Sequence, residues 1–81
     1  MSSSIIASNA ARFPAQIAVG FVKSPCLLND MGDSEVEEVA RILLRAGQRV
    51  SLESLLESDG VLSSVKGSIS RVLAAHKRSM H

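Results

Sequence analysis

Hydrophobic residues recur with helical spacing over residues 34–46, and this is the clearest pattern in the chain. The apolar positions follow i, i+3, i+4, i+7 spacing and share one helix face: Val36, Val39, Ala40 and Leu43. Ser34 and Glu37 have the spacing of a capping box, and Gly47 supplies a C-terminal stop. Glu37 and Arg41 are four residues apart in the order that favours an ion pair. We therefore expect a helix over residues 34–46.

Two more helices are predicted, over residues 51–58 and 61–78. Ser51 is a candidate N-cap for the first, whose apolar side is Leu52, Leu55 and Leu56; Asp59 and Gly60 end it. The apolar stripe of the second is Leu62, Val65, Ile69, Val72 and Leu73, continued by His76. Small residues form a row opposite this stripe: Ser63, Gly67, Ser70 and Ala74. Such a row permits close approach of another helix or of a phosphate backbone.

The N-terminal third has a weaker pattern. Residues 2–12 are rich in Ser and Ala without an acid, which is typical of a mobile arm and overlaps with organelle targeting segments. Residues 15–23 fit a short strand by their alternation, or a helix that begins at Pro14. Residues 24–33 have the composition of a linker. We therefore expect an all-α protein with a small three-helix domain at 33–81. An N-terminal arm and linker at 1–32 would precede it, and the arm would be irregular or form a short strand.

Composition narrows the class of protein. The chain has 81 residues, 46% of them hydrophobic, which fits one small globular domain. No apolar run reaches membrane-spanning length, so no membrane span is expected. Two phenylalanines and no Trp or Tyr cannot build a stacking platform for single-stranded nucleic acid. The single cysteine, Cys26, excludes an intramolecular disulfide; we expect a small, at least partly buried thiol and an intracellular, reducing compartment.

Charge is distributed in blocks, although the net charge is only +1. Residues 1–29 carry two bases and no acid. Residues 30–59 hold all eight acids and three arginines, a net charge of −5, and residues 60–81 hold four bases and no acid. This layout predicts either a basic C-terminal segment that meets phosphates, or pairing of acidic and basic segments within the fold or between subunits.

The sequence offers no arrangement of residues typical of catalysis, and we expect no enzyme, metal site, cofactor or small-molecule substrate. His76 and His81 are five apart, not the four that place a metal-binding pair on one helix face. His76 continues an apolar stripe and is expected to be a partly buried structural residue. Glu37 and Glu38 are adjacent, so on a helix their side chains point apart.

Residues 34–78 follow the order helix, short turn, short helix, glycine turn, longer helix. This order resembles the three-helix core of helix-turn-helix and winged-helix DNA-binding domains. The second helix of those families has an apolar stripe, matched here by Leu52, Leu55 and Leu56, and a glycine turn, matched by Gly60. The resemblance implies that the third helix faces the major groove of DNA. The residues it assigns to base edges are Ser63, Ser64, Lys66, Gly67, Ser70 and Arg71, and those it assigns to phosphates are Arg49, Lys77 and Arg78.

Two functions therefore remain open. The first is a small helical protein–protein interaction or assembly protein that acts as an oligomer, with a second copy or another protein as partner. The second is a helix-turn-helix DNA-binding protein, a transcriptional regulator, with duplex DNA as partner. The same residues at 49 and 63–78 serve either function, because a helix and a DNA groove both favour small polar residues with a few bases.

Overall fold

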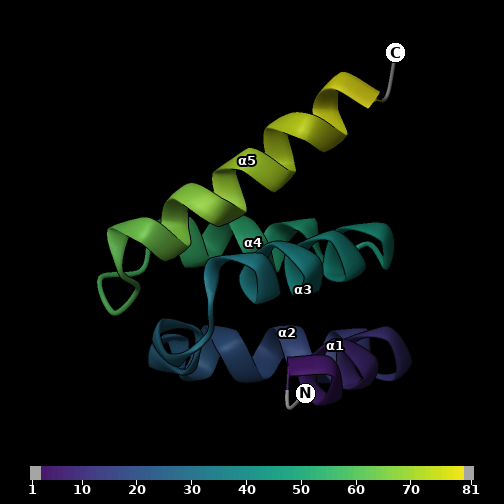
Figure 1. Cartoon of the computed structure of the whole chain (residues 1–81), viewed down its shortest axis with the longest axis horizontal. Coiled ribbons are helices and arrows are strands. Elements are labelled where there is room, and N and C mark those ends of the chain that lie inside the picture. The colour runs from purple at the N-terminus through teal and green to yellow at the C-terminus, as the bar shows by residue number, and fades with distance from the viewer. Residues whose placement is uncertain (1–2, 80–81) are drawn as a thin grey trace.

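The computed structural model describes residues 3–79 of the chain, with side chains placed from Ile6 to Lys77. Within this range the elements are α1 (Ser3–Arg12), α2 (Pro14–Lys23), the 3₁₀ helix η1 (Pro25–Asp30), α3 (Asp33–Arg45), α4 (Arg49–Leu56) and α5 (Ser63–Ser79). These residues include no strand. Figure 1 shows α1 and α2 on one side, α3 and α4 in the middle, and α5 crossing the opposite side. The predicted all-α fold is confirmed.

The N-terminal arm is helical, so the expectation of an irregular or short-strand arm is wrong for the residues described. Pro14 occupies the first turn of α2, where its missing N–H costs nothing. Ala18 and Phe21 are the buried residues of α2. Their separation of three positions is the spacing of a helix face, not the alternation of a strand. A helix satisfies its own backbone hydrogen bonds, whereas a lone strand needs a partner strand, and residues 3–79 contain none.

At both ends of helix α3, backbone groups and not side chains provide the caps. Its N-cap is Gly32 and no side chain caps it, so the predicted capping box of Ser34 and Glu37 is wrong. Gly47 has φ of +83°, the left-handed conformation that favours glycine, and ends the helix as predicted. The N–H of Gln48 then donates to the carbonyl of Leu43 at 2.9 Å, which satisfies a carbonyl in the last turn.

Helix α4 begins two residues before the predicted Ser51, so Ser51 lies inside the helix and does not cap it. The connection from α4 to α5 is held by Asn29 of η1. The Asn29 Nδ2 donates to the carbonyl of Gly60 at 2.9 Å, and the N–H of Leu62 donates to the Asn29 Oδ1 at 3.0 Å. These two bonds attach the N-terminal part of the chain to the entry of α5.

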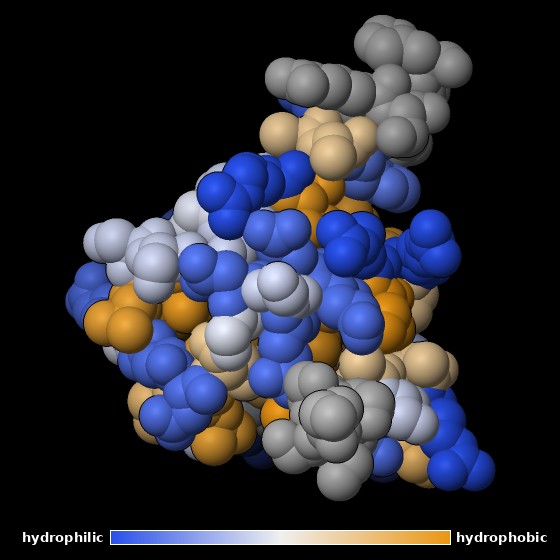
Figure 2. Space-filling view, viewed as in Figure 1, coloured by the Kyte–Doolittle hydropathy of each residue, from blue (hydrophilic) through white to orange (hydrophobic). Residues whose placement is uncertain are grey.

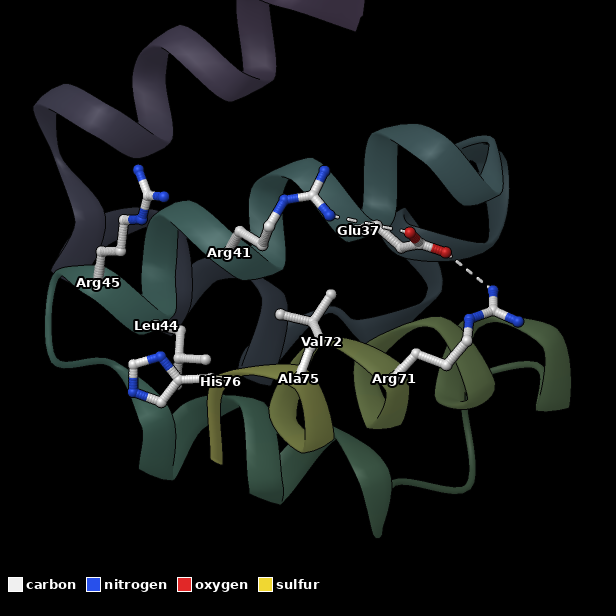
Figure 3. A pocket seen from close by; sticks show the side chains of 8 residues that line it. All are labelled: Glu37, Arg41, Leu44, Arg45, Arg71, Val72, Ala75 and His76. Carbon is white, nitrogen blue, oxygen red and sulfur yellow. Dashed lines mark hydrogen bonds and ion pairs between the residues drawn. The ribbon is translucent and has the colours of Figure 1, made fainter. Parts of the chain in front are cut away.

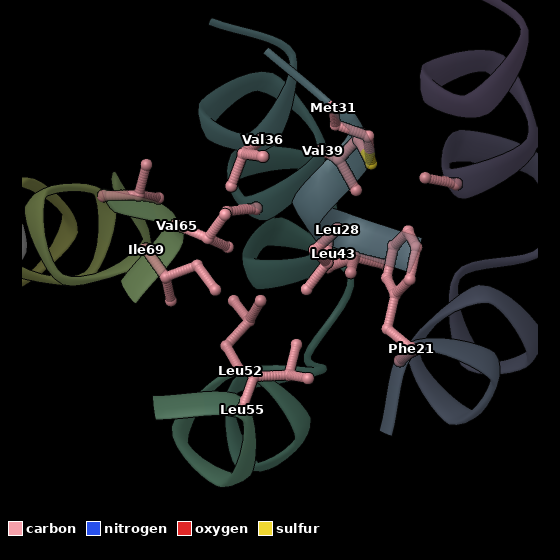
Figure 4. Packing of buried hydrophobic residues seen from close by; sticks show 14 of the residues in the cluster. Phe21, Leu28, Met31, Val36, Val39, Leu43, Leu52, Leu55, Val65 and Ile69 are labelled. Carbon is pink, nitrogen blue, oxygen red and sulfur yellow. The ribbon is translucent and has the colours of Figure 1, made fainter. Parts of the chain in front are cut away.

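The core collects apolar residues from every helix, as Figure 4 shows around α3 and α4. Its largest fully buried side chains are Leu43, Leu52, Leu55, Ile69, Val36, Val39 and Val65. Phe21 and Leu28 line the same small cavity as Leu43, so α2 and η1 complete the core of the three C-terminal helices. Cys26, in contrast to the expected burial, is exposed on η1.

Candidate functional site

A hollow on the surface lies between α3 and α5, and we call it the basic groove. It has a volume of about 490 Å³. Figure 3 shows side chains from both helices around it, with charged groups at the edges and Leu44 and Val72 between them. The complete lining is Glu37, Arg41, Leu44, Arg45, Arg71, Val72, Ala75 and His76.

The walls of the basic groove follow from helical spacing. Glu37, Arg41 and Arg45 are each four residues apart on α3, so they lie along one flank of that helix. Arg71 and Ala75 repeat this spacing on α5, as do Val72 and His76 in a second row. Val72 is buried and lines the groove together with Leu44 of α3. The neighbouring row of Arg71 and Ala75 therefore lies opposite the charged flank of α3.

Glu37 connects the two walls. The Arg71 Nη2 donates to the Glu37 Oε2 at 2.8 Å, across 34 positions of sequence. The Arg41 Nη1 lies 3.9 Å from the other oxygen of Glu37, which confirms the predicted pair four residues apart. The Arg71 guanidinium also donates to the Oγ of Ser68, whose hydroxyl donates to the carbonyl of Ser64. Arg71 is therefore oriented by α3 and by its own helix.

The basic groove keeps an excess of positive charge. Its lining holds three arginines and one carboxylate, which leaves a charge of +2 without His76. Among the side chains from Ile6 to Lys77, none forms an ion pair with Arg45. An apolar floor below an excess of guanidinium groups is suited to a partner that carries carboxylates or phosphates next to an aliphatic side chain.

The residues predicted to face DNA do not all share one face of α5. Ser63, Gly67 and Ser70 are exposed on the side away from the core, as the small-residue row requires. Lys66 and Arg71 are separated by about 140° around the helix axis at 3.6 residues per turn. Since Arg71 faces α3, Lys66 lies on a different side of α5.

The remaining predicted residues are scattered. Ser64 and Lys77 are exposed on α5. Arg49 is exposed on α4 and its Nε donates to the Glu53 Oε2 at 3.0 Å. The side chain of Arg78 lies outside the described part of the chain, as does His81. His76 is half-buried, as predicted.

Sequence reasoning missed the pair of Glu37 with Arg71 and the support of Arg71 by Ser68. Ser68 is the one polar residue recorded as buried in the described range, and its hydroxyl is hydrogen-bonded there. The row of Glu37, Arg41 and Arg45 was the available signal, because charges at successive intervals of four mark a helix flank. Their partner on α5 could not be identified without the crossing geometry of the two helices.

No helix in the described range is long and apolar enough to cross a membrane. The same residues include no cluster of three or more His, Cys, Asp or Glu side chains placed to hold a metal ion. Comparison of the chain with models of known families, with curated proteins and with solved structures finds no match.

Proposed function

We propose that this protein is a small helical assembly protein that associates with copies of itself, with α5 at the interface. The observation that carries the proposal is that α5 contributes one face to the core and leaves the others open. Val65, Ile69 and Val72 attach it to the rest of the molecule. The outward face and the flank along the basic groove both remain accessible.

Gly67 supports this assignment. A Cβ atom added at this position would have no neighbour within 4 Å, so packing inside one chain does not require glycine here. Glycine inside a helix costs about 1 kcal/mol relative to alanine. A requirement imposed by another molecule would account for that cost. The core also lacks Trp and Tyr, and small domains with light cores often gain stability by association.

The exposed surface is better suited to binding a second copy through charged groups than through a broad apolar face. On the side seen in Figure 2, hydrophobic side chains form small areas separated by hydrophilic ones. The larger apolar side chains that remain exposed are distributed over several elements: Phe13, Val19, Val22, Leu27, Val50 and Leu62. An interface on such a surface combines single apolar contacts with charged pairs around them.

Sedimentation equilibrium tests the proposal. Between about 10 μM and 1 mM protein, a range in which micromolar assemblies form, we expect the average mass to rise above that of the 8.6 kDa chain. The variant Gly67→Leu tests the outward face of α5, because a bulky side chain there blocks close approach of another helix. A constant mass of one chain over the whole range would contradict self-association.

The DNA-binding alternative has one supporting observation of its own. Lys66 and Lys77 lie on one side of α5 with Ser70 between them, which is an arrangement suited to phosphate contacts. Fluorescence anisotropy with random duplex DNA over a salt series tests it. Binding that weakens steeply with salt, with a shallower slope for Lys66→Ala and Lys77→Ala, would favour this function; absence of binding at low salt would contradict it.

A further inference from the structure

The second surface of interest is an acidic ridge on α4 and the turn after it, formed by Val50, Glu53, Glu57 and Asp59. Val50 is 75% exposed, the highest value among the large hydrophobic side chains from Ile6 to Lys77. Val50, Glu53 and the C-cap residue Glu57 lie within about 60° of one another around the α4 axis. Asp59 follows on the exposed turn.

The acidic ridge and the basic groove match in charge and in chemistry. The ridge carries three carboxylates, and even with the neighbouring Arg49 its charge is −2. The groove has an excess of +2 and an apolar floor that includes Leu44. In the groove, guanidinium groups lie around an aliphatic surface. It is therefore suited to bind an exposed valine that is flanked by carboxylates.

These two surfaces do not meet within one chain. The groove is lined by α3 and α5 alone. The ridge lies on the side of α4 opposite Leu52 and Leu55, which are buried in the core. The ion pairs of the described residues join Glu37 to Arg41, Glu37 to Arg71, and Arg49 to Glu53, so none connects the groove with the ridge.

We infer that the basic groove of one copy binds the acidic ridge of a second copy, so that the protein assembles head to tail. This inference rests on the proposed self-association and specifies its interface. Val50 enters the groove above Leu44 and Val72, while Glu53 and Glu57 approach Arg41 and Arg45. Arg45 is the principal cation for this contact because it has no ion pair within the described chain.

A head-to-tail contact has a structural consequence. Each copy uses two different surfaces, so a bound pair still exposes one free groove and one free ridge. Such heterologous contacts continue into rings or open filaments, whereas a two-fold symmetric contact stops at the dimer. Association driven by exposed charges also weakens as salt screens them.

Charge reversal on each surface tests the inference. Arg41→Glu with Arg45→Glu disables the groove, and Glu53→Lys with Glu57→Lys disables the ridge. We expect each double variant to lower the self-association constant at least about tenfold, and an equimolar mixture to associate more strongly than either variant alone. The mixture succeeds because each variant retains the surface that the other lacks.

Matched controls separate this effect from a change in net charge or in folding. Arg12→Glu with Lys23→Glu changes the charge by the same amount as the groove variant, at exposed positions on α1 and α2. It should associate like the wild type. Far-UV circular dichroism and thermal unfolding establish that each variant is folded.

The possible outcomes distinguish self-association itself from the particular interface between groove and ridge. Wild type that remains a single chain contradicts both the proposed function and this inference. Wild type that associates while the groove and ridge variants associate equally well overturns the inference alone. Loss of association only in Gly67→Leu would place the interface on the outward face of α5 and also overturn it.

Discussion

Helices α3 and α5 contact each other on two sides that differ in chemistry. On the core side, Val36 and Leu43 of α3 lie with Val65 and Ile69 of α5 in a cluster that excludes water. On the groove side, the same helices present Glu37 and three arginines around an open cavity. The core side therefore accounts for stability, whereas the groove side presents charged groups to solvent. One helix pair combines a stabilising contact with an open charged surface because each occupies its own flank.

The largest expected effect is on the core side. Leu43→Ala removes a side chain that is 1% exposed and leaves a cavity between α3 and its neighbours. Such truncations cost about 2–5 kcal/mol of the free energy of unfolding. Urea denaturation followed by circular dichroism measures the loss. A cost below about 1 kcal/mol would contradict the role of Leu43 as a central core residue.

The next effect concerns association and leaves stability nearly unchanged. Val50→Lys places a cation on the acidic ridge, and in the proposed contact this cation would face the arginines of the groove. We expect the self-association constant to fall about tenfold, equivalent to about 1.4 kcal/mol. Val19→Lys is the matched control, because Val19 is 49% exposed on α2 and belongs to neither surface. Equal losses in the two variants would attribute the effect to general surface charge.

The smallest effect is expected at the ion pair across the groove. Arg71→Ala removes the 2.8 Å ion pair with Glu37. The side chains of Arg71 and Glu37 are both accessible to solvent. Exposed pairs contribute about 0.2–1 kcal/mol, and the contribution falls with added salt. A double-mutant cycle with Glu37→Ala, measured by chemical denaturation at low and high salt, isolates the interaction. A coupling energy above about 2 kcal/mol would show that the groove side contributes to stability on the scale of the core.

Much of the fold could be predicted from the sequence because the three C-terminal helices have strong apolar periodicity. Val36, Val39 and Leu43 are buried as their spacing predicts, and so are Val65, Ile69 and Val72. Gly47 ends α3 through the positive φ that its lack of a side chain permits. These features depend on local spacing, which a single sequence displays.

The errors arose where tertiary contacts decided the outcome. Residues 15–23 have both alternating and helical apolar spacing, and only packing of Phe21 on the core distinguishes the two. The spacing of Ser34 and Glu37 fits a capping box, but the Glu37 carboxylate accepts from Arg71 of a distant helix. Half of the basic groove could be predicted from the row on α3. The other half required the position of α5.

Intermolecular disulfide trapping between the groove and the ridge tests the head-to-tail contact directly. Cys26 is exposed and is first replaced by Ser. One chain then carries His76→Cys in the groove, and another carries Ser54→Cys beside the ridge, so that the charged residues of both surfaces are retained. On oxidation of the mixture, the account predicts a covalent heterodimer in excess of either homodimer. Predominant homodimers of one variant, or no trapped species from a mixture that still associates, would contradict it.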